Sequence, residues 1–138
     1  MSQLDYLQRV VAGEVQGANV ASLIGMRMVA AEKGSVTFEL EVGERHMSPP
    51  GSLHGGILCD IADGAMGCSC LSLLDDHESF TTIELKINFL KGVTSGKLTA
   101  VGNVIRAGRT LTLCDCRVTD EAGSLVAYAT STCMTFRD

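Results

Sequence analysis

Apolar and polar residues alternate along several segments of the chain, and this spacing predicts strands. The clearest case is segment 35–42, where every second residue is apolar: Val36, Phe38, Leu40 and Val42. Successive side chains of a strand point to opposite faces, so we expect a strand with one buried face. Segment 81–90 repeats the pattern with Ile83, Leu85, Ile87 and Phe89. Further strand-like segments are 26–31, 97–105, 110–119 and 124–136.

Two other segments predict helices. Apolar residues recur at helical spacing in segment 2–15, and segment 54–74 is apolar on nearly every side of a helical projection. A helix of the second kind is covered by other structure rather than lying on a surface. The connections between the predicted strands are short, which favours antiparallel neighbours. We therefore expect an α+β fold in which an antiparallel sheet of about five or six strands covers the helix at 54–74.

Composition indicates a folded domain and argues against several functions and locations. The chain has 138 residues, 46% hydrophobic and 20% charged, which is typical of one folded domain, 1–138, with a helical segment at 1–20. A formal net charge of -5 disfavours nucleic-acid binding. Segment 1–15 lacks the pattern of a signal peptide, and Asp60 and Asp63 interrupt the longest apolar stretch. We expect a cytoplasmic protein without a membrane span.

The chain contains six cysteines, and their spacing gives no sign of a metal site. No Cys-x-x-Cys pair occurs, and no histidine stands at zinc-finger spacing. Without a secretory signal, we expect reduced thiols that pack as small hydrophobic side chains. They are Cys59, Cys68, Cys70, Cys114, Cys116 and Cys133. We expect the chemistry of the protein to need no metal and no other cofactor.

Candidate chemistry is concentrated where the helix at 54–74 begins. Gly55 and Gly56 stand where loop becomes helix, and the first N–H groups of a helix lack partners within it. The helix dipole favours negative charge at that end, so an incoming carbonyl oxygen can be polarised there as in an oxyanion hole. A tight helix start that needs small residues explains the same glycines.

Two carboxylates, Asp60 and Asp63, stand in this otherwise apolar helix. Such a group is costly unless it is solvated, paired or functional, and it can act as a nucleophile or as a general base for water. Asp63 follows Gly55 by eight residues, which is roughly 12 Å along a helix. The two can meet one carbonyl only if a second copy of the chain supplies one of them. These considerations leave the choice between Asp60 and Asp63 open.

The three histidines add little on their own. His54 directly precedes Gly55, where it is a candidate base, although fixing the loop is the more ordinary role. His46 and His77 fall in predicted loops, where we expect them to be solvated.

Two runs of sequence resemble a known family. They are HGGILCDIADGAMG at 54–67 and TTIELKINFLK at 81–91. Both are similar to hotdog-fold acyl-CoA thioesterases related to the phenylacetyl-CoA and 4-hydroxybenzoyl-CoA enzymes, and the order of elements agrees over about residues 20–137. The resemblance implies the hotdog fold, a curved antiparallel sheet wrapped around a long central helix. It also implies hydrolysis of acyl-CoA thioesters, aromatic ones included, to a carboxylate and free CoA.

The resemblance also assigns roles to residues. The catalytic acid of the family falls on Asp63 rather than Asp60. The family's oxyanion donor, a backbone N–H at the helix start, falls on Gly55 and acts across a subunit interface. His54 matches a histidine that shapes this loop, and Thr82 falls near a Ser or Thr that holds the water or the substrate in some members.

The chain departs from the family at Ser48, where many relatives carry an Asn that places the attacking water or the thioester. Serine also forms hydrogen bonds but has a shorter reach. In the family, CoA lies along a surface groove with its phosphates near basic residues. The candidates here are Lys91, Arg106 and Arg109, and the alternative for each is an ordinary solvated charge without a ligand. The family further implies a homodimer and a homotetramer.

Two other functions remain as alternatives. A hotdog acyl-thioester dehydratase would pair a catalytic His with an acid in a different motif, and the His54-Gly55-Gly56 helix start argues against it. A non-enzymatic acyl-CoA-binding module would not need an intact acid at Asp63.

Overall fold

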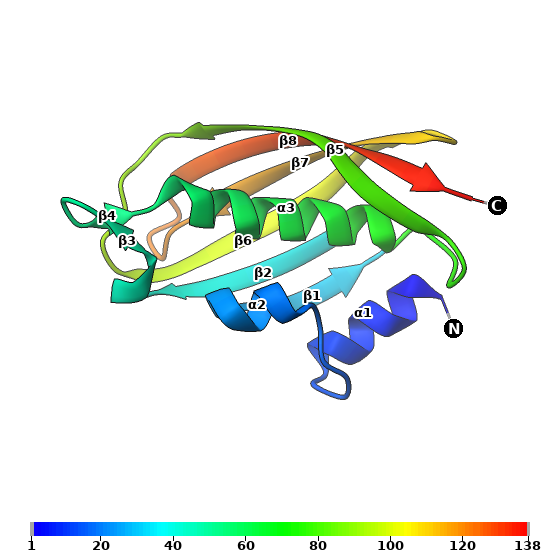
Figure 1. Ribbon diagram of the computed structural model, residues 1–138, viewed down its shortest axis with the longest axis horizontal. Helices are drawn as coiled ribbons and strands as arrows, with labels where there is room; N and C mark the ends of the chain where they lie inside the picture. Colours follow the sequence, from blue (N-terminus) through cyan, green and yellow to red (C-terminus); the bar gives the residue numbers. More distant parts are fainter. Residues whose placement is uncertain (1, 138) are drawn as a thin grey trace.

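The computed structural model describes residues 2–137 and shows a curved antiparallel sheet wrapped around one long helix (Figure 1). The sheet has six strands in the order β1-β2-β6-β7-β8-β5. Their bounds are β1 Met26–Glu32, β2 Ser35–Val42, β5 Ser79–Phe89, β6 Gly96–Ala107, β7 Leu111–Thr119 and β8 Leu125–Phe136. The predicted α+β fold, with a helix held by an antiparallel sheet, is confirmed.

The central helix is α3, Gly55–Leu71, and two short helices lie along the β1 side of the sheet (Figure 1). The remaining elements are α1 Gln3–Val11, α2 Asn19–Ile24, the 3-10 turn Glu44–His46, β3 Met47–Ser48 and β4 Ser52–Leu53. The predicted helix at 2–15 is too long, since the chain turns at Gly13 with a positive φ of 77°. Helix α2 lies in a segment for which the sequence pattern predicted no element.

The hydrophobic core lies between α3 and the face of the sheet that packs against it. On β2 the four alternating apolar residues are all buried, as predicted: Val36, Phe38, Leu40 and Val42. Strand β6 approaches the helix so closely at Gly102 that a Cβ there would collide with the backbone carbonyl of Ala65. Glycine at this position therefore lets sheet and helix backbones meet.

Strand β5 forms an edge of the sheet and departs from the predicted alternation. A bulge interrupts its pairing with β8 between Thr82 and Glu84. Ile83 and Phe89 are 51% and 55% exposed, whereas Leu85 is half-buried. The strand therefore presents large apolar side chains and a free row of backbone groups at one side of the molecule.

His46 is buried, so the prediction of a solvated loop residue is wrong for it. The Gly43 N–H donates to His46 Nδ1 (2.9 Å), and His46 Nε2 lies 2.7 Å from the Ile24 carbonyl oxygen. With Nδ1 accepting, Nε2 carries the proton and donates to Ile24. The ring therefore ties the loop after β2 to the end of α2.

All six cysteines are free, as predicted. Burial raises the pKa of the Cys68 thiol, and of the Cys116 thiol, to about 12. These two side chains are neutral packing groups at physiological pH. Among the described residues, no helix is long and apolar enough to cross a membrane.

Candidate active site

Asp63 and Thr82 form the central contact of the site. Asp63 is half-buried near the middle of α3, and Thr82 faces it from the edge strand β5. The Thr82 hydroxyl donates a hydrogen bond to Asp63 Oδ1 at 2.9 Å. Asp63 Oδ2 accepts no hydrogen bond within residues 2–137. One carboxylate oxygen is thus held in place while the other is left to interact with water or substrate.

Asp60 lies one helical turn before Asp63 and is exposed. Its carboxylate makes no hydrogen bond or ion pair in the described part of the chain. Partial desolvation raises the pKa of Asp60, and the nearby charge of Asp63 raises it further. The two carboxylates are thus electrostatically linked, but only Asp63 is fixed by a partner side chain.

The first turn of α3 combines a cap with an unused donor. His54 is the N-cap, and its Nδ1 accepts the Gly56 N–H at 2.8 Å. The Gly55 N–H, one residue earlier, has no acceptor among residues 2–137. A Cβ on Gly55 would lie 2.9 Å from the tip of the exposed Phe89 ring, so any larger residue at this position requires that ring to shift. Both sequence-based explanations of the glycine, a tight start and an available donor, therefore have a structural basis.

Two hollows meet at the carboxylates. The first, called here the open cleft, is a volume of about 380 Å³ beside β5, lined by Cys59, Asp60, Asp63 and residues 82–85. The second, called here the N-terminal cavity, is about 470 Å³ and lies between α3 and the segment that contains α1 and α2. Asp60 and Asp63 line both hollows. A ligand atom beside Asp63 thus has space on two sides.

The other predicted site residues lie apart from this centre. Ser48 is on β3, where its hydroxyl bonds the Ser52 carbonyl (3.4 Å), and it lines neither hollow. Lys91 pairs with Asp120 (2.6 Å) beside the β7–β8 turn. Arg106 and Arg109 are exposed at the opposite end of β7, next to the β6–β7 turn. Within one chain, the three basic candidates are not brought together.

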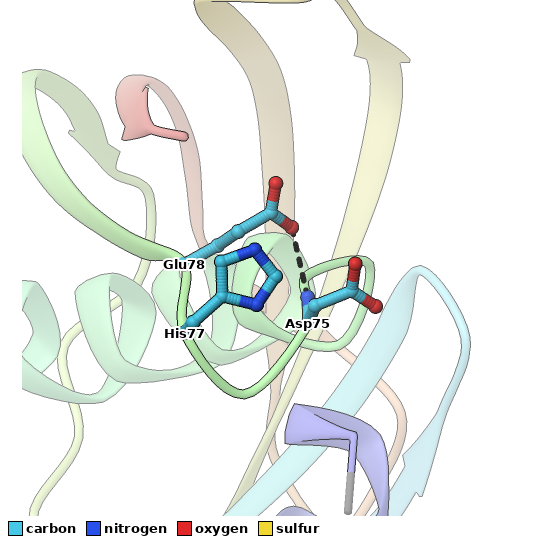
Figure 2. Close-up of side chains that lie close together, drawn as sticks. All are labelled: Asp75, His77 and Glu78. Atoms are coloured by element: carbon cyan, nitrogen blue, oxygen red, sulfur yellow. Dashed lines mark hydrogen bonds between the residues drawn. The ribbon is translucent and has the colours of Figure 1, made fainter. Parts of the chain in front are cut away.

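A cluster of Asp75, His77 and Glu78 lies in the turn between α3 and β5 (Figure 2). Its ligand atoms lie within 4.8 Å of one another. The Glu78 carboxylate, however, already accepts the Asp75 N–H (2.8 Å) and an Arg137 guanidinium hydrogen bond (2.9 Å). These bonds hold the pKa of Glu78 below its usual range. The cluster closes a turn and joins it to the C-terminal strand.

Sequence reasoning missed the residues around the N-terminal cavity, because it predicted no structure for segment 17–25. The signal was present: Val20, Leu23 and Ile24 have helical spacing, and Gly25 follows them. Gly25 adopts the left-handed conformation that ends α2, with a φ of 88°.

A curved antiparallel sheet wrapped around one long helix is the hotdog fold. The profile of the thioesterase superfamily matches residues 50–127, and the chain belongs to this family. The resemblance to hotdog-fold acyl-CoA thioesterases that the sequence suggested is confirmed.

Individual relatives agree with this assignment. The chain is 29% identical over 109 residues to a 1,4-dihydroxy-2-naphthoyl-CoA hydrolase of Listeria monocytogenes, covering 79% of this chain and 89% of the relative. It is 25% identical over 136 residues to human acyl-coenzyme A thioesterase 13, covering 95% of each chain. A solved structure of a mutant thioesterase from Pseudomonas aeruginosa superposes with a TM-score of 0.83 at 28% identity, covering 94% and 92% of the two chains.

Proposed function

We propose that the protein hydrolyses acyl-CoA thioesters at a site built from Asp63 and Thr82 of one subunit and Gly55 of another. Water adds to the thioester carbonyl, the carbon–sulfur bond breaks, and a carboxylate and free CoA leave. The observation that carries the proposal is the Asp63 carboxylate, which lines the open cleft and has one oxygen fixed by Thr82 and one without a hydrogen-bond partner among the described residues.

Asp63 supplies the negative charge and the proton acceptor. Acting as a general base, its free oxygen takes a proton from the attacking water. Acting as a nucleophile, it forms an acyl-enzyme anhydride that water then cleaves. A single turnover in oxygen-labelled water separates the two routes, because the nucleophilic route leaves label in the Asp63 side chain.

Gly55 supplies the donor for the carbonyl oxygen. Its N–H is at the positive end of α3 and has no acceptor among residues 2–137, so it can stabilise the oxyanion that develops during attack. His54 keeps the neighbouring Gly56 N–H occupied and so fixes the shape of this first turn. Thr82 supplies the hydroxyl group that holds Asp63. Ser48 is assigned to water positioning on the family resemblance alone, since within one chain its hydroxyl bonds Ser52 and lies apart from Asp63.

A homodimer is required because Gly55 and Asp63 lie roughly 12 Å apart along one helix. The edge strand β5 is the natural contact, since it carries Thr82, a free row of backbone groups and the exposed Ile83 and Phe89. Pairing of subunits here would bring a second α3 tip towards the first cleft. We further propose that the dimers assemble into a homotetramer and that Lys91, Arg106 and Arg109 bind the phosphates of CoA. We also propose that the protein is located in the cytoplasm, whose reducing conditions suit six free thiols.

The shared site is tested by mixing two inactive subunits. Asp63→Asn removes the acid. Gly55→Pro removes the N–H at the first helical position, where proline is tolerated. Each variant alone should lose at least about a hundredfold in kcat. Co-expressed in equal amounts, they should regain about a quarter of wild-type activity, because half of the dimers are mixed and each mixed dimer has one intact site.

The readout is CoA release measured with a thiol reagent on a panel of acyl-CoAs. Purified mixed dimers that stay inactive would show that Asp63 of one subunit and Gly55 of the other do not share a site. Formation of an enoyl product from a 3-hydroxyacyl-CoA would instead support the dehydratase. Tight CoA binding without thiol release by the wild type would support the binding module.

A further inference from the structure

The N-terminal cavity has no role in the chemistry described so far. It is about 470 Å³, within the range of small-molecule sites. One of its walls is the face of α3 that carries Asp63, and the opposite wall is the N-terminal segment with α1 and α2. The cavity therefore begins at the reacting position and extends away from β5, under a segment that belongs to the same chain.

Its walls are mainly apolar. Val10 on α1, Ala21 on α2, Phe38 on β2 and Leu71 on α3 contribute to them. Gly64, next to Asp63, also lines the cavity, and Met26 and Phe38 pack closely against it.

The polar side chains of the cavity are largely engaged elsewhere. The Tyr6 hydroxyl donates to the Gln16 carbonyl oxygen at 3.4 Å. The Arg27 guanidinium pairs with Glu39 at 3.4 Å and is mostly exposed, so it offers the cavity its aliphatic stem. Cys68 is a neutral thiol. The charges left facing the cavity are those of Asp60 and Asp63, at the end where it meets the open cleft.

We propose that the N-terminal cavity receives the acyl group of the substrate, and that the chain's own N-terminal segment sets the acyl length it accepts. This inference rests on the proposed function, since it places the thioester carbonyl at Asp63. The CoA sulfur then leaves through the open cleft. The accepted class is an uncharged, apolar acyl group, aliphatic or aromatic.

The same geometry excludes acyl groups with a second carboxylate. A dicarboxylic acyl group would bring its free charge past Asp60 and Asp63 and into an apolar space, where an unpaired ion is costly. We therefore expect glutaryl-CoA to be hydrolysed at least about a hundredfold less efficiently than hexanoyl-CoA. For straight-chain substrates, kcat/KM should rise about threefold to fourfold for each methylene until the cavity is full.

The test narrows the cavity from two sides. Ala21→Phe fills it from α2, and Cys68→Leu fills it from α3. Leu23→Phe is the matched control, because Leu23 is on the same short helix but is 76% exposed and does not line the cavity. Each variant is assayed for CoA release on saturated acyl-CoAs from acetyl to lauroyl, with thermal unfolding measured in parallel.

Ala21→Phe and Cys68→Leu should each lower kcat/KM for the longest substrates by about tenfold or more. Both should leave the shortest acyl-CoA that the wild type hydrolyses within about twofold. Leu23→Phe should follow the wild-type length profile. Should Ala21→Phe fail to fold, Cys68→Leu alone still decides the matter.

The outcomes separate the two proposals. A wild type that releases no CoA from any acyl-CoA overturns the proposed function and this inference together. A wild type that is active, with length profiles unchanged in Ala21→Phe and Cys68→Leu, overturns only the inference. Efficient hydrolysis of glutaryl-CoA would also overturn it.

Discussion

Polar side chains on two sides of α3 differ in how fully their hydrogen bonds are satisfied within the described residues. On the face towards the sheet, Ser69 is fully buried; its hydroxyl donates to the Ala65 carbonyl oxygen (2.7 Å) and accepts the Val36 N–H (3.1 Å). On the side of α3 that borders the open cleft and the N-terminal cavity, called here the open face, Asp63 has one partner side chain, Thr82 on β5, and Asp60 has none among the described residues. Polar groups that are satisfied within the chain stabilise the fold, while those left partly unsatisfied beside a hollow are available to a substrate. Within this one helix, Ser69 therefore contributes to stability, whereas Asp63 and Asp60 are available for chemistry.

The largest effect should come from the open face. Asp63→Asn should lower kcat by about 10²–10⁴-fold, because the amide can neither take a proton from water nor attack the carbonyl. The free energy of unfolding should hardly change, since the amide oxygen can still accept the Thr82 hydrogen bond. Steady-state CoA release and urea unfolding check the two parts. Near-normal turnover on the best substrate would refute the assignment of Asp63.

The sheet-facing side should show the reverse pattern. Gly102→Ala places a Cβ against the Ala65 carbonyl, which neither backbone can avoid without moving. We expect a loss of about 2–3 kcal/mol in the free energy of unfolding, with kcat of the folded fraction little changed. Gly92→Ala is the control, because nothing lies within 4 Å of a Cβ there. Equal stabilities of the two variants in urea would contradict the close packing of β6 on α3.

A smaller effect should follow from loosening the acid without removing it. Thr82→Val deletes the hydroxyl that holds Asp63 Oδ1, and should lower kcat about tenfold with little change in KM. Thr82→Ser keeps a hydroxyl and should recover most of the loss. If serine and valine behave alike, the hydrogen bond does not position the carboxylate.

Much of this arrangement could be predicted from the sequence because it follows from local periodicity. The alternation in β2 indicates which face of the strand is buried. The helix at 54–74 is apolar nearly all round, which indicates that other structure covers it. Both predictions agree with the structure. The choice of Asp63 over Asp60 came from family resemblance, since both carboxylates have the same sequence context. The Thr82 contact gives that choice a physical basis.

The features that were missed depend on contacts between distant segments. His46 is buried because Gly43 and Ile24 supply partners for its two ring nitrogens, and only folding brings Ile24 near. The bulge at Ile83 exposes a side chain that strict alternation would bury, which is a property of the β5–β8 pairing. Helix α2 lines the N-terminal cavity opposite α3, and the local sequence pattern does not indicate what that helix packs against.

Asp60 provides the last and smallest test of the comparison. It shares the open face with Asp63 but has no partner side chain to hold it, so Asp60→Asn should keep kcat within about threefold.

The raised pKa of Asp60 means that the folded state binds a proton more tightly than the unfolded chain does. This contribution to stability is complete below the ordinary carboxyl pKa and is lost as the pH rises through the raised value. Asp60→Asn should therefore be slightly more stable than the wild type at neutral pH, and the difference should shrink towards about pH 4. Urea unfolding at the two pH values measures it, and a fall in kcat as large as that of Asp63→Asn would mean that both carboxylates, rather than the anchored one, carry the reaction.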